Sequence, residues 1–147
     1  MKPQVIILSL TLLVMLSSAC NTGNEKKAES ASGPKIVKEF RDDGTLSSAK
    51  QVDSEGYIHG VRVNYYEDGR TVHSKITYEH GRKHGPAEWY FKDGTVGERT
   101  YFYYGKRKGI TRRYHDNGNL REEVEYDLGE EVPGSKKEYD LSGNLKD

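Results

Sequence analysis

The sequence predicts an all-β fold, an elongated single-layer antiparallel meander of β-hairpin repeats. Three observations predict it: a glycine period of 24–25 residues, Asp-Gly or Asn-Gly pairs at that period, and an apolar content that is low and rich in tyrosine. The 147 residues include 16 Gly and 11 Tyr, and only 33% are hydrophobic, against about 45–50% in ordinary globular domains. This composition favours a thin sheet carrying aromatic side chains over a thick two-layer core.

The first glycine series marks one end of each hairpin. Its members follow one another at 24 or 25 residues, and four of the five follow Asp or Asn: Gly44, Gly69, Gly94, Gly118 and Gly143. Asp-Gly and Asn-Gly are preferred at the centre of tight type I′ turns, in which both central residues have positive φ. We therefore expect a tight turn of this type at each of these tips.

A second glycine series predicts the opposite end of each hairpin. Glycine pairs bound the segments “GYIHG” (56–60), “GRKHG” (81–85), “GKRKG” (105–109) and “GEEVPG” (129–134), and the second Gly always precedes the next tip Gly by nine residues. This spacing predicts longer loops there, joined to the tips by strands of about eight residues. Pro86 is expected at a strand start and Pro133 in a loop, where a missing N–H is tolerated.

Aromatic residues recur at fixed places in the repeat, which predicts a cross-strand ladder. One column contains Phe40, Tyr65, Tyr90, Tyr114 and Tyr139. A second column, three residues before each glycine pair, contains Asp53, Tyr78, Phe102 and Tyr126. A third column, two residues after each tip glycine, contains Leu46, Thr71, Val96, Leu120 and Leu145.

Residues 1–19 have the features of an export signal. Lys2 supplies a positive charge, residues 5–16 are an apolar run too short to span a bilayer, and small residues precede Cys20, the only cysteine. This arrangement resembles the lipobox of bacterial lipoprotein precursors. The resemblance implies cleavage before Cys20, a lipid anchor on it, and a place in the cell envelope. It favours the outer over the inner membrane, because the residue after the cysteine is Asn21 and not the Asp that favours inner-membrane retention.

The sequence divides into three predicted parts: a lipoprotein signal peptide (1–19), the lipidated Cys20 with a flexible linker (20–35), and the repeat domain (36–147). The linker sequence “NTGNEKKAESASGPK” is small and polar and has no apolar periodicity. A flexible chain of this length spans about 20 Å root-mean-square. The linker would therefore hold the repeat domain away from the lipid surface.

The repeat resembles the MORN repeat, in the bacterial variant found in YwqK-type proteins assigned as antitoxins and in many lipoproteins. The segments “YYEDG”, “YEHGRKHG”, “YFKDG”, “YYGKRKG” and “YHDNG” carry this resemblance. It implies a hairpin-repeat fold and a non-catalytic protein-interaction module, antitoxin-like or immunity-like, with an unidentified protein partner. MORN repeats also occur in lipid kinases, but this chain has no kinase motif.

The sequence predicts neither an enzyme nor a cofactor, metal or nucleic-acid site. It has no G-x-S-x-G elbow, and “GKRKGITRR” lacks the order of a phosphate-binding P-loop. The 23 Lys and Arg balance 23 Asp and Glu, so no overall basic field favours nucleic acid. His80 and His84 bracket an expected turn, and no cysteine or clustered carboxylate completes a metal-ligand set with them.

One candidate interaction surface is aromatic and consists of Trp89, Phe91, Tyr101 and Tyr103. Trp89 and Tyr90 are consecutive in an expected strand, so they point to opposite faces. We expect the Trp89 face to be an exposed groove for a peptide, a glycan or a partner strand. The alternative is that a strongly twisted sheet curls and buries much of both faces.

A second candidate surface is basic and consists of Arg82, Lys83, Lys106, Arg107 and Lys108. We expect these residues on adjacent loops at one edge of the sheet, where they could meet anionic lipid headgroups or glycans. Each charge near a membrane would contribute about 1 kcal/mol. The alternative is an ordinary solvated turn, because glycine recurs at this place in every repeat and positive charge does not.

Overall fold

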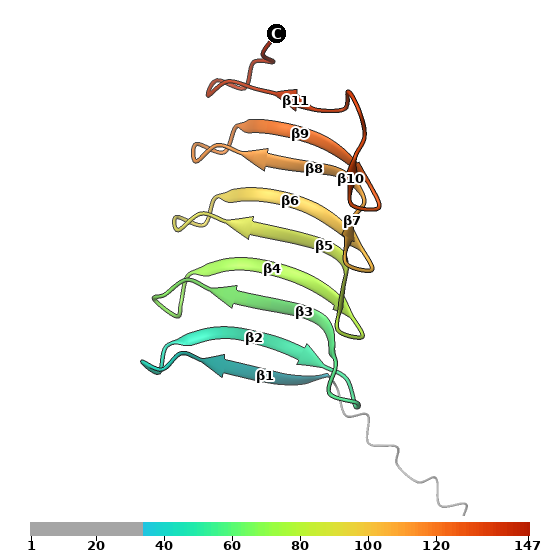
Figure 1. Ribbon diagram of the computed structural model, residues 1–147. Coiled ribbons are helices and arrows are strands. Elements are labelled where there is room, and N and C mark those ends of the chain that lie inside the picture. The colour runs from blue at the N-terminus through green and yellow to red at the C-terminus, as the bar shows by residue number, and fades with distance from the viewer. Residues whose placement is uncertain (1–33) are drawn as a thin grey trace, which may run out of the picture. The chain divides into compact units, whose positions relative to one another are not determined.

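The computed structural model describes residues 34–147, and these form one antiparallel sheet of eleven strands (Figure 1). The predicted all-β hairpin meander is confirmed. The part of the chain that is described contains no helix long and apolar enough to cross a membrane. The signal peptide, Cys20 and nearly all of the predicted linker lie outside it. The strands are β1 (Lys35–Phe40), β2 (Leu46–Val52), β3 (Ile58–Tyr65), β4 (Val72–Glu79), β5 (Arg82–Tyr90), β6 (Val96–Tyr103), β7 (Lys106–Arg107), β8 (Gly109–Tyr114), β9 (Leu120–Asp127), β10 (Glu130–Glu131) and β11 (Lys137–Glu138).

The strands follow chain order across the sheet, from β1 to β6 and then β8, β9 and β10. The short strand β7 pairs with β6, and β11 pairs with β9. Each 24–25-residue unit therefore contributes one hairpin, and successive hairpins stack side by side in a single layer (Figure 1). Equivalent residues of neighbouring repeats consequently lie close together.

The Asp-Gly and Asn-Gly tips are hairpin turns, but the predicted type I′ geometry is wrong. At the first tip Arg41 N donates to Thr45 O, and Gly44 N donates to Arg41 O, both at 2.9 Å. Gly44 has a φ of 81°, whereas Asp43 has no positive φ. This is a type I turn followed by a left-handed glycine in a bulge. Asp43 Oδ1 accepts a hydrogen bond from Thr45 N at 2.9 Å, which holds the turn in this form.

Type I′ turns occur instead at the opposite edge of the sheet. Their centres are two consecutive residues with positive φ: His80-Gly81, Tyr104-Gly105 and Leu128-Gly129. The flanking residues pair directly, as Glu79 does with Arg82. The prediction of longer loops at “GRKHG” and “GKRKG” is therefore wrong, because these segments begin strands β5 and β7. The second glycine of the pair has a different role, and Gly85 (φ 111°) forms a bulge inside β5.

This bulge explains why Pro86 lies within β5 and not at its start. In the ladder between β4 and β5, Tyr78 pairs with Lys83 and Ile76 pairs with Ala87. The three residues from 84 to 86 therefore face Thr77 alone. Thr77 Oγ1 donates to the Pro86 carbonyl oxygen at 2.9 Å, so the irregular ladder tolerates the missing N–H of proline.

The predicted aromatic column forms one cross-strand pair in each repeat, which confirms the repeat spacing. In the second repeat the partner is Val72, the residue that follows the column residue Thr71. The pairs are Phe40 with Leu46, Tyr65 with Val72, Tyr90 with Val96, Tyr114 with Leu120, and Tyr139 with Leu145.

The buried core lies on one face of the sheet, which we call the inner face. Its centre is a cluster of Ile76, Ala87 and Phe102, with Tyr78 and Trp89 packed against it. Its other buried positions carry small polar residues as well as Val52 and Val124, and Thr100 and Thr111 share a hydrogen bond of 2.6 Å there. Small side chains at these positions suit a sheet whose described residues form a single layer.

Candidate functional site

A groove of about 300 Å³ lies at the tips of the central repeats, and aromatic and charged side chains line it. Three successive repeats contribute, because their tips follow one another along the same edge of the sheet. The lining includes Tyr66 from the tip after β3, Trp89 and Phe91 from β5 and its tip, Tyr114 from the end of β8, and Arg121 from β9.

The aromatic walls of the groove are held by specific contacts. The Tyr66 hydroxyl donates to the Tyr90 carbonyl oxygen at 2.6 Å, and its ring lies edge-on to His73 with centroids 4.8 Å apart. Gly97 lies so close to Phe91 that a Cβ there would approach its ring to 3.3 Å. The absence of a side chain at Gly97 therefore lets Phe91 sit against the strand. A wall fixed in advance reduces the entropy lost on binding.

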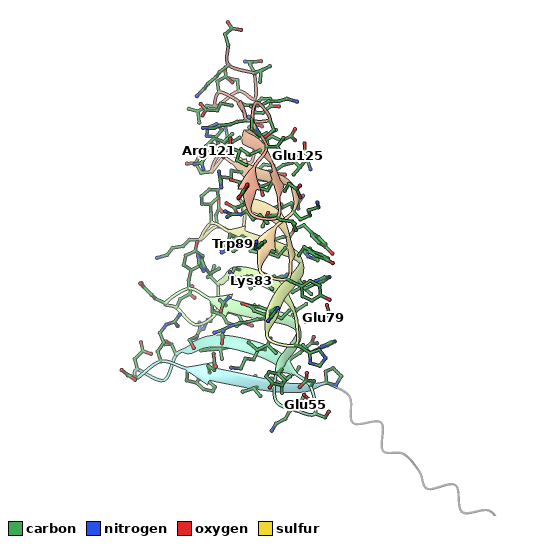
Figure 2. The ribbon with its side chains drawn as sticks, turned by 45° about the vertical axis from the view of Figure 1, so that its right-hand side comes forward. Glu55, Glu79, Lys83, Trp89, Arg121 and Glu125 are labelled. Carbon is green, nitrogen blue, oxygen red and sulfur yellow. The ribbon has the colours of Figure 1, made fainter. Side chains whose placement is uncertain are left out.

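Trp89 forms part of the groove and also belongs to the inner face. Its ring makes an edge contact with Phe102, with centroids 6.4 Å apart. In Figure 2 the Trp89 and Arg121 side chains lie to the left of the ribbon, and Glu79 and Glu125 lie to its right. Arg121 is exposed, whereas Trp89 is half-buried. Trp89, packed against the core, therefore forms the base of the groove, and the exposed Arg121 forms part of its rim.

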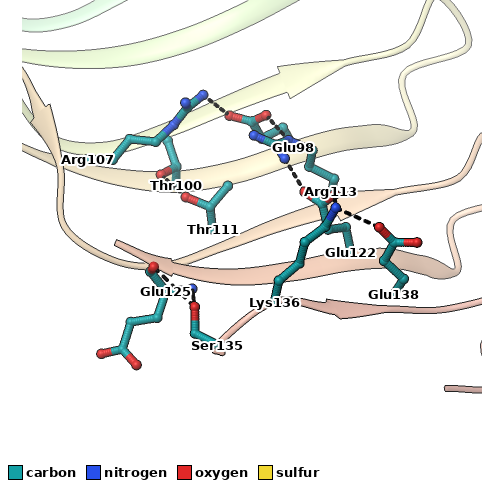
Figure 3. Close-up of polar contacts among 10 residues, drawn as sticks. All are labelled: Glu98, Thr100, Arg107, Thr111, Arg113, Glu122, Glu125, Ser135, Lys136 and Glu138. Carbon is teal, nitrogen blue, oxygen red and sulfur yellow. Dashed lines mark hydrogen bonds and ion pairs between the residues drawn. The ribbon is translucent and has the colours of Figure 1, made fainter. Parts of the chain in front are cut away.

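A network of ion pairs fixes the charges beside the aromatic residues (Figure 3). Glu98 accepts from Arg113 Nε at 2.8 Å and from Arg107 Nη2 at 2.9 Å, and Arg113 also pairs with Glu122. Burial lowers the pKa of Arg113, but hydrogen bonding to Glu98 and the charges of Glu98 and Glu122 outweigh burial and raise that pKa above its ordinary value. The guanidinium therefore remains charged and in place.

Tyr90 behaves as a fixed hydrogen-bond donor. Burial, together with its hydrogen bond to the Glu88 carboxylate, raises the pKa of Tyr90 to about 12. The hydroxyl consequently stays protonated at neutral pH and offers neither a base nor a nucleophile. The groove offers aromatic surfaces and fixed ion pairs.

The structure separates the four predicted aromatic site residues. Trp89 and Phe91 line the groove, whereas Tyr101 and Tyr103 alternate with the core residue Phe102 and so lie on the opposite, outer face. The predicted grouping is therefore wrong, and so is the prediction that the Trp89 face is the exposed one. Both faces of the sheet carry aromatic residues, so alternation alone did not identify the buried face.

Tyr101 and Tyr103 belong to a separate cluster around His84 on the outer face. The His84 ring lies 6.3 Å from Tyr101, 5.3 Å from Tyr103 and 4.5 Å from Tyr104, measured between centroids. The negative charge of Glu79 raises the pKa of Tyr104. These contacts bind the β4–β5 and β6–β7 turns to each other.

The predicted basic residues lie in strands or beside a bulge and do not form one patch. Lys83 Nζ lies 5.0 Å from the ring centroid of Phe102, on the inner face. Arg107 pairs with Glu98 at 2.9 Å, and Lys108 pairs with Asp127 at 2.6 Å. Arg82 and Lys106 are exposed, each directly after a type I′ turn. The positive charge is therefore divided between two faces and partly neutralised.

The surface predicted from the sequence did not include Tyr66, Tyr114 or Arg121, which also line the groove. A signal was present, because Tyr66 and Phe91 are 25 residues apart and so occupy equivalent tips. The predicted surface took its residues from two neighbouring strands and one tip, whereas the groove joins the tips of three successive repeats. Comparing equivalent tip positions in successive repeats would have found Tyr66.

The fold and the groove define a β-hairpin repeat protein. Residues 107–128, from β7 through β9, match the family model described as MORN repeat variant. The chain is therefore similar to MORN-repeat proteins in this unit, which contains one tip and both of its strands. Such repeats are commonly protein or lipid interaction modules and are generally not enzymes. No curated protein and no solved structure matches the chain.

Proposed function

We propose that this chain is a lipid-anchored cell-envelope protein that binds a protein partner, without catalysis, through the groove at the repeat tips. The observation that carries the proposal is the groove itself, in which Tyr66, Trp89, Phe91 and Tyr114 stand beside Arg121. Trp, Tyr and Arg are the residues that most often dominate the binding energy of protein interfaces. The volume suits one or two inserted side chains of a partner segment.

The cellular address in this proposal rests on the sequence of residues 1–20. An export signal followed by Cys20 supports a lipid anchor, and Asn21 favours the outer membrane. A chain exported from the cytoplasm would meet its partner in the envelope. The resemblance to antitoxin-type repeat proteins then favours an immunity-like role, in which the domain binds and neutralises a protein that arrives there.

The alternative, in which basic side chains bind anionic lipid headgroups or glycans, has less support. Arg107 and Lys108 are engaged by carboxylates, and Lys83 lies over an aromatic ring on the inner face. Arg82, Lys106 and Lys108 are the exposed members of the predicted patch, and Lys108 is paired with Asp127. Binding by that edge should weaken steeply with salt, whereas binding through aromatic contacts should not.

The test is affinity capture from native membranes with the wild type and with two groove variants, Phe91→Ala and Arg121→Ala. Trp89→Ala is less suitable because Trp89 packs against the core. Tyr101→Ala, on the outer face, and Arg82→Ala, at the opposite edge, are the matched controls. The captured protein should be lost with the groove variants and kept with both controls.

Two outcomes would contradict the proposal. If the groove variants capture the same protein with unchanged affinity, the groove is not the binding surface. If Arg82→Ala alone abolishes capture and added salt does the same, the basic edge is the site. Anchoring has its own test, because Cys20→Ser should release the protein from the membrane fraction.

A further inference from the structure

We propose that Asp53, His59 and His80 form a binding site for a divalent transition-metal ion. One potential ligand atom from each of these residues lies within 4.8 Å of the other two. Asp53 directly follows β2, His59 is the second residue of β3, and His80 is in the turn between β4 and β5. The repeat brings these three positions to the same edge of the sheet, opposite the tips.

The Asp53 carboxylate is oriented in advance. Its Oδ1 atom accepts hydrogen bonds from the backbone N–H of Glu55 at 3.0 Å and of Tyr57 at 2.9 Å. Its Oδ2 atom is shielded from solvent and accepts no hydrogen bond, although His80 Nδ1 lies only 3.2 Å away. A shielded carboxylate oxygen without a partner is costly, and a bound cation would satisfy it.

A second turn shows that this oxygen is unusual. At the β3–β4 tip Asp68 caps the turn in the same way through Oδ1, but its Oδ2 accepts a hydrogen bond from the hydroxyl of Thr71. Turn geometry therefore accounts for one oxygen of Asp53 and leaves the other oxygen outside the hydrogen bonds of the turn. That second oxygen is the one that faces His80.

The two imidazoles complete a donor set of two nitrogens and one oxygen. The rings of His59 and His80 are 5.3 Å apart between centroids and inclined at 76°. Both histidines are exposed, and 62% of the His80 side chain is accessible, so small side-chain rotations can bring the ligand atoms to bonding distance. Imidazole and carboxylate ligands suit Zn²⁺, Cu²⁺ or Ni²⁺ better than Mg²⁺ or Ca²⁺. Three protein ligands leave coordination positions for water.

The sequence predicted no metal site, because His80 and His84 bracket a turn and no clustered carboxylate completes a ligand set with them. The structure brings together a different histidine, His59, and supplies Asp53. One repeat later the equivalent positions are Tyr78, His84 and Tyr104. The fold therefore does not require metal ligands at these positions, and His84 serves as a built-in control.

Such a site would connect two neighbouring hairpins, since its ligands come from the β2–β3 hairpin connection, from β3 and from the turn after β4. An ion that binds only the folded state stabilises it by an amount that grows with the ratio of free ion to dissociation constant. Zn²⁺ should therefore raise the melting temperature of the wild-type protein.

The test is calorimetric titration of metal-free full-length protein with Zn²⁺, with melting temperature as a second readout. We expect one ion to bind each chain. Asp53→Asn, His59→Gln and His80→Asn should each reduce affinity at least about tenfold, as loss of a ligand demands. Asn tolerates positive φ, so His80→Asn is suited to keep the turn. His84→Gln should bind Zn²⁺ as the wild type does.

Three results would overturn the proposal. The first is no saturable binding of Zn²⁺ or Cu²⁺ to the wild type at millimolar concentration, and the second is an equal loss of affinity in His84→Gln. The third needs no variant: amide resonance shifts on Zn²⁺ addition that avoid residues 53–60 and 79–82 would place the ion elsewhere. Nitrogen couplings from two imidazoles in the spectrum of bound Cu²⁺ would support the site.

Discussion

Replacing Phe102 tests which face of the sheet holds the protein together. Phe102 is 7% exposed and contacts Ile76, Ala87 and Trp89, whereas its neighbour Tyr101 is 42% exposed on the outer face. Truncating a buried Phe to Ala costs about 3–5 kcal/mol. The described residues form a single layer, so water can reach the resulting cavity, and we expect about 3 kcal/mol for Phe102→Ala. Tyr101→Ala should cost about 1 kcal/mol or less.

The assay is urea unfolding followed by far-ultraviolet circular dichroism, which reports the loss of the β-sheet. Phe102→Leu keeps most of the buried volume and should lie between the wild type and Phe102→Ala. If Tyr101→Ala destabilises the protein as much as Phe102→Ala, both faces contribute equally. The assignment of one inner face as the core would then be refuted.

Three further predictions concern the turns and the ion-pair network. Gly94→Ala should destabilise the protein by about 1–2 kcal/mol. The cost comes from backbone strain alone, because φ is 90° and an added Cβ would meet nothing within 4 Å. Gly94→Asn should cost less in urea unfolding, and an unchanged stability of Gly94→Ala would contradict this reasoning. Hydrogen bonds from the Thr71 hydroxyl and neighbouring backbone N–H groups lower the pKa of Asp68 from 3.8 to about 2. The Asp68 carboxylate therefore stabilises the folded state above pH 3.8, and this stabilisation is lost as the pH falls towards about 2. An NMR titration of the Asp68 carboxyl group with a midpoint near 3.8 would refute this prediction. Glu98→Gln should cost about 1–3 kcal/mol, because it weakens the partner of Arg113, and unchanged urea stability would show that water replaces the ion pair.

The sequence predicted the hairpin repeat because glycine spacing acts locally and repeats. Every tip glycine in the series from Gly44 to Gly143 has positive φ in the structure. The predicted turn types were assigned to the wrong edges of the sheet, because Asp-Gly is compatible with both a type I′ turn and a type I turn followed by a glycine bulge. The number of residues between the flanking pairs decides which one forms. At His80-Gly81 the strands close over two residues, a length that the glycine series alone does not specify.

The candidate sites were harder to predict because they depend on contacts across strands. The groove joins Tyr66, Phe91 and Tyr114, which lie in three hairpins. The proposed metal site joins Asp53 to His80 through the alignment of two connections. Each bulge shifts that alignment by a residue or more. In the sequence a bulge is indicated only by a glycine, such as Gly85, and glycines also occur at the turns.

Each hairpin of this sheet pairs only with the hairpin before it and the hairpin after it. Excising the 25 residues from 70 to 94 would join Gly69 to Thr95. Thr95 normally follows Gly94, the tip glycine equivalent to Gly69, so the hairpins on either side would still find a matching neighbour. Gene duplication or loss of such a unit can therefore change the length of the sheet while every remaining hairpin keeps a paired neighbour, although loss of this particular unit would remove His80, Trp89 and Phe91. The number of hairpins sets the length of the sheet, and evolution can change that number by whole repeats.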